Sequence, residues 1–145
     1  MNLMIKLFVL FVLFSCCKDK KVTPNEPVPA FDNKLAVTWK LESVTNSAGI
    51  ITTNPTDKEI LTVFEKDTNA LSFNNNGSMG GGTYALKSGS GIKISIIRGD
   101  KGGWPNGPWL DLYLENMNKA SSYQIANNQL KVKTSENNTI LFAKQ

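Results

Sequence analysis

Few side chains in the main part of this sequence could act as acids, bases, nucleophiles or metal ligands. The chain contains no histidine, the usual residue for proton transfer near neutral pH and the commonest metal ligand. Its two cysteines, Cys16 and Cys17, lie near the amino terminus, so residues 35–145 have no thiol nucleophile, disulfide or zinc cluster. The carboxylates of this region form no metal-binding or acid–base spacing; they are Glu42, Asp57, Glu59, Glu65, Asp67, Asp100, Asp111, Glu115 and Glu136. We therefore expect no enzymatic activity, no metal and no cofactor.

The cysteines follow a segment with the features of a secretion signal. Lys6 and the free amine give a positive start, and an apolar run extends from Leu7 to Phe14. This run is too short to span a bilayer, which needs about 20 apolar residues, but it fits a signal peptide. The sequence Leu13-Phe14-Ser15-Cys16 resembles the lipobox of bacterial lipoproteins. The resemblance implies that residues 1–15 are removed and that Cys16 carries acyl chains such as palmitate. A plain cleaved signal is the alternative.

Residues 16–34 are predicted to be the lipid anchor and a flexible tether. The charged run Lys18–Lys21 is followed by Pro24, Pro27 and Pro29, a composition that keeps a chain extended. Fully stretched, this tether reaches about 55 Å. Surface-export signals of some lipoproteins contain an acidic cluster. The charged run here lacks such a cluster. We therefore expect the periplasmic face of the outer membrane, with surface exposure as the alternative.

The positive charge of the chain comes almost entirely from lysine. The formal net charge is +4, and Arg98 is the only arginine. The basic residues are scattered, whereas bidentate recognition of bases and phosphates favours clustered arginine. We therefore expect no nucleic-acid partner. The chain is predicted to be a monomer that contacts the membrane through its lipid anchor and an unidentified protein or cell-wall partner through its surface.

Two short motifs are interpreted as structural. The run Gly80–Gly82 lacks the order of a dinucleotide-binding or phosphate-binding loop and leads into a predicted strand. We expect a bulged strand, where a bulky side chain crosses close to the backbone. Arg98-Gly99-Asp100 matches a cell-adhesion tripeptide. Matches of three residues are common by chance, so we interpret these residues as part of an ordinary loop.

Trp104 and Trp109 are the best candidates for a recognition surface. They flank Pro105 and Pro108 in a glycine-rich segment, where two indole rings could form an aromatic platform. The alternative is that they plug one end of the sheet, because aromatic side chains contribute so much burial energy.

Apolar and polar residues alternate over much of residues 36–145. This pattern is typical of antiparallel strands with one buried and one wet face. Ile60–Glu65 is ambiguous, and turn signals such as Asn76-Gly77 separate the other strands, so a meander of seven or eight strands is expected. The predicted inward residues are Val37, Trp39, Leu41, Leu71, Phe73, Tyr84, Leu86, Ile92, Ile94, Ile96, Ile125, Leu130, Val132 and Phe142.

One segment has a helical period. Pro108 can open a helix, and Leu110, Tyr113, Leu114 and Met117 then share one face. The chain is therefore predicted to be all-β, a small antiparallel meander barrel of about eight strands with one α-helix inserted before the last three strands.

The same region resembles the META/HslJ-like domain of bacterial envelope proteins. Trp39-Lys40-Leu41 is similar to the family's W-x-L, and Gly82-Thr83-Tyr84 to its G-x-Y; the helix segment and three strands follow in the family's order. Cysteines that many members carry before the G-x-Y and before the helix are missing, so no role of theirs carries over. The resemblance implies a lipocalin-like barrel in a bacterial (Bacteroidetes-like) lipoprotein. It gives Trp39, Leu41, Gly82 and Tyr84 structural roles, offers no catalytic residues, and suggests a loose link to stress tolerance.

The predicted organisation is a signal peptide (1–15), an acylated tether (16–34) and a β domain (35–145). We expect a non-enzymatic cell-envelope lipoprotein that acts through surface contacts with proteins or wall components. A lipocalin-type barrel that binds a small ligand is the alternative. The predicted inward residues are mostly large, which favours a filled barrel without room for a lipid.

Overall fold

Strands make up most of residues 30–55, 57–97 and 107–145, which are the residues that the computed structural model describes. The elements, in chain order, are η1 (Asn33–Leu35), β1 (Thr38–Thr45), β2 (Ile51–Thr53), β3 (Ile60–Phe64), β4 (Ala70–Asn75), β5 (Ser78–Lys87), η2 (Ser88–Ser90), β6 (Gly91–Ile97), α1 (Pro108–Asn118), β7 (Ala120–Ala126), β8 (Gln129–Thr134) and β9 (Thr139–Lys144). Each strand from β3 to β9 pairs antiparallel with the next one along the chain, which confirms the predicted meander.

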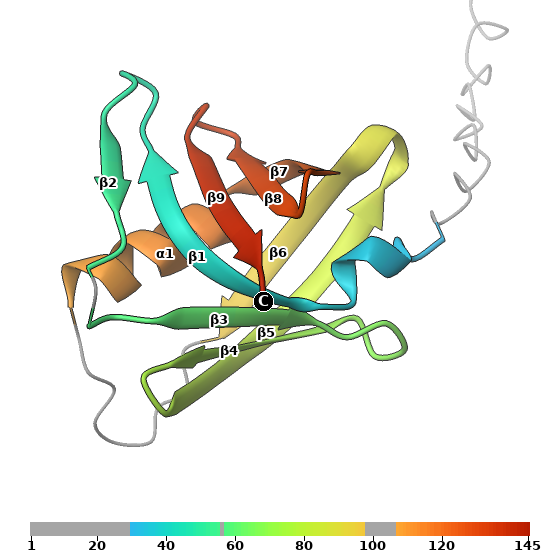
Figure 1. The fold of residues 1–145 in the computed structure, drawn as a ribbon. Helices are drawn as coiled ribbons and strands as arrows, with labels where there is room; N and C mark the ends of the chain where they lie inside the picture. Colours follow the sequence, from blue (N-terminus) through green and yellow to red (C-terminus); the bar gives the residue numbers. More distant parts are fainter. Residues whose placement is uncertain (1–29, 56, 98–106) are drawn as a thin grey trace, which may run out of the picture.

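Strand β1 closes this meander into a barrel (Figure 1). One edge of β1 pairs with β9, and the other edge pairs with β3 through Thr38, Trp39 and Lys40. The ring therefore consists of β1 and β3–β9. Strand β2 lies outside the ring and pairs only with the second half of β1, at Ser43 to Thr45. The predicted fold class is confirmed, and β2 is an addition that the alternation did not predict.

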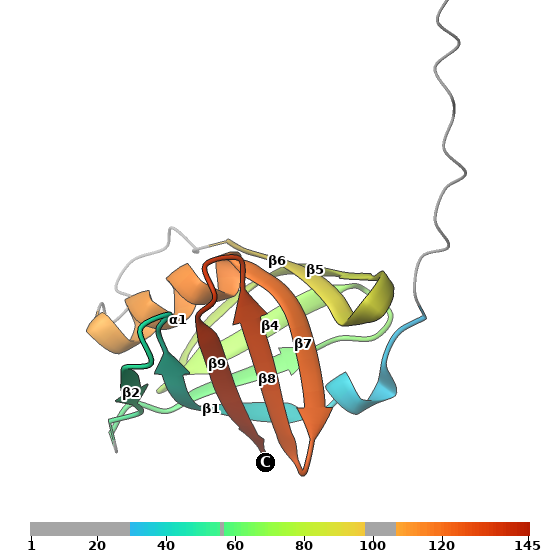
Figure 2. The ribbon, with the colours of Figure 1, turned by 90° about the horizontal axis from the view of Figure 1, so that it is seen from above.

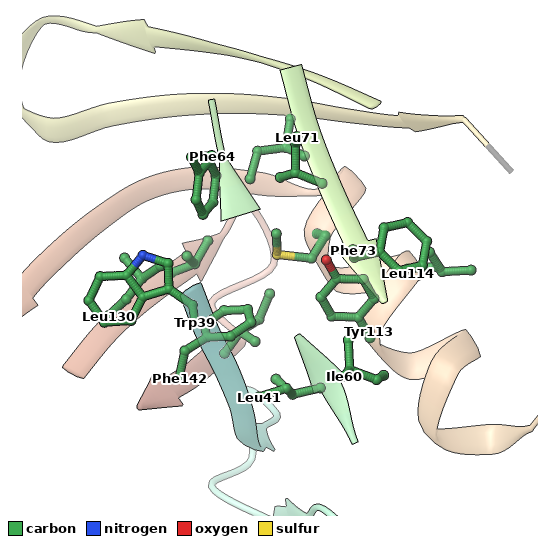
Figure 3. Close-up of a cluster of buried hydrophobic side chains, with 14 of the residues drawn as sticks. Trp39, Leu41, Ile60, Phe64, Leu71, Phe73, Tyr113, Leu114, Leu130 and Phe142 are labelled. Atoms are coloured by element: carbon green, nitrogen blue, oxygen red, sulfur yellow. The ribbon is translucent and has the colours of Figure 1, made fainter. Parts of the chain in front are cut away.

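Alternation along the strands places every second side chain in the barrel interior. In β3, Ile60, Thr62 and Phe64 are buried while Leu61 and Val63 are half-buried, so the ambiguous segment is a strand of the same kind. Most predicted inward residues belong to the buried core (Figure 3). Those that are only partly buried and pack against the core are Val37, Leu86, Ile96 and Ile125.

Helix α1 covers one end of the barrel (Figures 1 and 2). It begins at Pro108, whose ring sets φ for the first helical position and whose missing N–H is not needed there. The predicted helical face is buried: Leu110, Tyr113, Leu114 and Met117 are at most 8% exposed. Within the described ranges, no helix is long and apolar enough to cross a membrane.

The carboxyl end of α1 is fastened to the turns of the barrel. Asn138, between β8 and β9, donates from Nδ2 to Asn116 Oδ1 at 2.8 Å, and its Oδ1 accepts the backbone N–H of Ser47 at 2.9 Å. Asn118 Oδ1 accepts the N–H of Ile96 at 2.8 Å, near the place where β6 and β7 have separated. These side chains fix how the helix lies on the barrel.

The opposite end is covered by the segment that enters β1 (Figures 1 and 2). Leu35 is fully buried, and its carbonyl oxygen accepts the indole N–H of Trp39 at 3.1 Å. The ring centroids of Phe31 and Tyr84 lie 6.3 Å apart. Phe31, which belongs to the predicted tether of residues 16–34, thus brings an apolar ring that packs on the barrel.

Strand β5 contains the glycine run. Residues 80–82 pair in continuous register with β4, and Gly81 and Gly82 also pair in continuous register with β6, so the expected bulge is wrong. A Cβ on Gly82 would overlap the carbonyl oxygen of Ser95 and lie 2.7 Å from Cα of Ile96. The close approach of the β6 backbone, rather than a bulky side chain crossing the strand, explains the glycine.

Candidate functional site

The four residues with predicted structural roles lie in the interior or in tight packing and form no open site; they are Trp39, Leu41, Gly82 and Tyr84. Trp39, Leu41 and Tyr84 are at most 3% exposed. The Tyr84 hydroxyl donates to the carbonyl oxygen of Glu65 at 2.7 Å, so its polar end is satisfied within the barrel wall. These contacts hold the fold together and leave recognition to other surfaces.

The other predicted site residues have different positions. Cys16 and Trp104 lie outside the described residues, so the lipid anchor and one half of the tryptophan pair stay predictions. Trp109 is the second residue of α1 and is 6% exposed, which is too buried for an open aromatic platform. Its ring instead forms part of the wall of a recess.

This recess has a volume of about 430 Å³ and lies at the start of α1. Three segments that are distant in sequence form its wall: the loop before β3, the end of β4 and the first turn of α1. The lining residues are Pro55, Lys58, Asn75, Asn76, Gly107, Pro108, Trp109 and Leu110. Trp109 and the Asn76-Gly77 turn stood out in the sequence, but no signal in the sequence joined them to the loop at Pro55.

Asn76 holds the loop beside the turn between β4 and β5. Its Nδ2 donates to the carbonyl oxygen of Asp57 at 2.7 Å, and its Oδ1 accepts the N–H of Glu59 at 3.0 Å. Asn76 itself has a φ of 48°, a left-handed conformation that asparagine tolerates well. One side chain thus shapes the turn and positions the opposite wall of the recess.

The first turn of α1 presents free backbone donors at the recess. The N-cap residue, Gly107, has no side chain to cap the helix, and Pro108 has no N–H. The first backbone N–H that forms a helical hydrogen bond is that of Asp111, which donates to the carbonyl oxygen of Gly107 at 3.0 Å. The N–H groups of Trp109 and Leu110 therefore lack an acceptor among the described residues, and both residues line the recess.

Two side chains that line the recess have polar groups without a hydrogen-bonding partner among the described residues. Asn75 belongs to the inward row of β4 and is 4% exposed, and its carboxamide makes no hydrogen bond to a described residue. Nε1 of Trp109 is buried and also has no acceptor in the described part of the chain. Buried polar groups in folded proteins are nearly always paired, so the unpaired indole N–H of Trp109 is unusual.

A second hollow, of about 630 Å³, lies on the outer side of β1. It is lined mainly by charged and amide side chains: Lys40, Leu41, Glu42, Asn54, Asp57, Glu59 and Asn76. Its lysine is already paired, because Nζ of Lys40 lies 2.8 Å from Glu59 Oε1. With mainly charged and amide side chains in its wall and a lysine that is already paired, this hollow offers less to an organic ligand than the recess does.

The barrel interior holds one buried polar pair. The hydroxyl groups of Thr62 and Tyr113 lie 3.0 Å apart, and both residues are fully buried. Burial raises the pKa of Tyr113 above its ordinary value, although the hydrogen bond to Thr62 lowers it slightly. The phenol therefore stays protonated and serves packing rather than proton transfer. Across the described ranges, no group of three His, Cys, Asp or Glu side chains could hold a metal ion.

Comparisons with known proteins describe the fold alone. No family model and no curated protein matches the chain. A solved protein of the DUF4847 family from Bacteroides vulgatus ATCC 8482 is 16% identical with a TM-score of 0.57, covering 77% of this chain and 95% of its own. The NMR structure of a protein from Burkholderia xenovorans is 18% identical with a TM-score of 0.58, covering 88% and 96%. At such low identity the likeness supports the barrel architecture and says nothing about activity.

Proposed function

We propose that this chain is a lipid-anchored, non-enzymatic protein of the bacterial cell envelope that binds a partner through the outside of a filled barrel. The observation that supports this most is that side chains fill the interior of the barrel. Trp39, Phe73, Tyr113 and Phe142 are at most 1% exposed, and separate segments cover the two ends. A close-packed interior leaves no space for a ligand, so binding takes place on the outer surface.

A lipocalin-type barrel that encloses a small ligand is the second candidate. Such a protein needs an open mouth and a cavity of about 300 Å³ or more. The recess beside α1 is large enough, with about 430 Å³. It is lined by the loop at Pro55, the end of β4 and the helix start, not by the apolar rows of the interior. The recess thus favours a small ligand held at one end of a filled barrel.

The anchor and the location are part of the same proposal. Cys16 is the last residue of the lipobox-like sequence, and acyl chains on it would hold the chain at the outer membrane, on the periplasmic side. The residues between Cys16 and Phe31 would be the spacer. We also propose kinship with the META/HslJ-like family and its stress-related role, on the order of the motifs around Trp39, Gly82 and Tyr84.

Acylation can be tested with the two adjacent cysteines. Cys16→Ser should abolish the acyl mass and release the protein from membrane fractions, whereas Cys17→Ser should leave both unchanged. Intact-mass measurement and cell fractionation in a bacterial host give the readout. A wild-type protein without acyl mass, or equal effects of the two variants, would refute the anchor.

The filled barrel can be tested by native mass spectrometry of purified residues 30–145. We expect the mass of the bare chain, without a co-purifying lipid, and weak binding of hydrophobic dyes, since the interior has no room for either. A stoichiometric apolar ligand in the spectrum would overturn the proposal and establish the lipocalin-type candidate.

A further inference from the structure

The recess at the start of α1 has a positive electrostatic character. The helix begins there with free N–H groups on Trp109 and Leu110 and no side-chain cap. Such a helix start carries a partial positive charge and is complementary to an anion. Because the described part of the chain supplies no acceptor for these donors, a ligand oxygen can occupy that position.

Lys58 adds a full positive charge to the same wall. Among the described residues that line the recess, it is the only charged one. Its neighbour Asp57 is a weak partner, with 3.7 Å between Nζ and Oδ2, and the Lys58 side chain is 51% exposed. Asp111 lies in the first turn of α1 but does not line the recess. Lys58 is therefore placed to contact an anion that lies against the helix start.

Asn75 points independently to a ligand. Its residue is 4% exposed and lines the recess, and its carboxamide forms no hydrogen bond to a described residue. A ligand oxygen or N–H in the recess can therefore pair with this carboxamide. Asn75 comes from the sheet and not from the helix, so it is a second observation besides the helix terminus.

Half of the lining residues are apolar. They are Pro55, Pro108, Trp109 and Leu110, around a volume of about 430 Å³. Pockets that combine apolar walls with a few convergent polar groups are typical of small-ligand sites. An ion alone would leave these surfaces uncovered, so the ligand must also have an apolar part.

We propose that the recess binds an apolar carboxylate, with the carboxylate against the first turn of α1, Lys58 and Asn75, and the apolar part against Trp109 and Pro55. This inference rests on the proposal that the protein binds through its outer surface, and it names the class of ligand. The carboxylate belongs either to a free small acid or to the carboxyl terminus of a peptide, because both present the same two groups.

Calorimetric titration of the purified full-length chain in detergent tests the chemistry with four probes. These are phenylacetate, phenylacetamide, the peptide Ala-Ala-Phe with a free carboxyl terminus, and the same peptide amidated. We expect at least one of the two acids to bind with a Kd below about 1 mM, and its matched amide to bind at least about tenfold more weakly. Preference for phenylacetate assigns a free acid, and preference for the peptide acid assigns a chain terminus.

The position of binding is tested with matched variants and with NMR. Lys58→Gln should weaken binding of the acid about threefold or more, whereas Lys66→Gln, in the turn between β3 and β4, should have no effect. In the wild-type chain, the backbone amides of Trp109 and Leu110 should shift on titration. The indole N–H of Trp39, which is bonded to Leu35, should not.

Several outcomes would overturn the inference. They are the absence of binding by either acid, equal binding of acid and amide, or equal effects of the two lysine variants. Each of these leaves the filled barrel intact, because that proposal depends on native mass spectrometry of the bare chain. A lipid found inside the barrel would refute the proposed function even if the recess bound a carboxylate.

Discussion

Gly82 illustrates a constraint that acts on a single residue. The backbone of β6 occupies the space where a Cβ would lie, since Ser95 O and Ile96 Cα are both in contact range of that position. Any side chain there must push two paired strands apart, and backbone atoms cannot move aside as a flexible side chain can. The constraint comes from the pairing of β5 with β6.

Replacing Gly82 by valine should lower the free energy of unfolding by more than about 2 kcal/mol, because the new side chain overpacks the sheet. Thr83→Val on the same strand is the control, since residue 83 is exposed and should change stability little. Urea denaturation measures both. If Gly82→Val unfolds at the same urea concentration as wild type, the close approach of β6 is not a real constraint.

The buried hydroxyl pair of Thr62 and Tyr113 links the sheet to the helix. Thr62→Val or Tyr113→Phe alone leaves one hydroxyl buried without a partner, which should cost about 1–3 kcal/mol. The double variant removes both hydroxyls and should cost less than the sum of the single variants. A double-mutant cycle by chemical denaturation measures this difference. Strictly additive costs would indicate that the two hydroxyls do not interact.

Two elements that are not strands close the ends of the barrel. Helix α1 covers one end with a buried face, and the segment from Phe31 to Leu35 covers the other. The N-terminal cover is short, yet it contributes several interactions. Asp32 caps η1 by accepting the N–H of Lys34 at 3.0 Å, and its other oxygen lies 3.4 Å from the Tyr123 hydroxyl.

The contribution of this cover can be measured by truncation. A chain of residues 34–145 should fold but be less stable than residues 30–145 by about 1–3 kcal/mol, because it lacks the Phe31 ring and the Asp32 contacts. Circular dichroism should show a mostly β spectrum with a small helical part for both. Phe31→Ala in the longer chain should reproduce much of the loss. Equal stability of the two chains would place residues 30–33 in the tether after all.

At the scale of the whole molecule, buried tyrosine makes stability depend on alkaline pH. Burial raises the pKa of Tyr113 above the ordinary value of 10.0, so the folded state keeps a proton that the unfolded state loses. The stabilisation is complete below pH 10 and decreases as the pH rises from there towards the folded pKa.

The free energy of unfolding should therefore fall as the pH rises above about 10, and Tyr113 should account for up to about 1.4 kcal/mol per pH unit of that slope. Denaturation of wild type and Tyr113→Phe at matched alkaline pH values isolates this contribution, because the other tyrosines are present in both. Parallel pH profiles for the two proteins would contradict it.

The sequence alone predicted the strand meander, the helix that begins at Pro108 and most of the buried residues. It could do so because a period of two or of 3.6 directly records which side of an element faces the core. Trp39 and Tyr84 were assigned inward for this reason, and they lie there. Even the glycine run was correctly placed in a strand, although the reason for it was wrong.

Only the tertiary structure decided the closure by β1, the position of β2, the cover by Phe31 and the recess. Each of these depends on contacts between segments far apart in the chain, which no local period records. The recess combines Lys58 from a loop, Asn75 from the end of β4 and Trp109 from the helix start. Of these three residues, only Trp109 stood out in the sequence, as a candidate for a recognition surface. Their common position arises because the closed barrel brings the end of β4 to the helix that covers it.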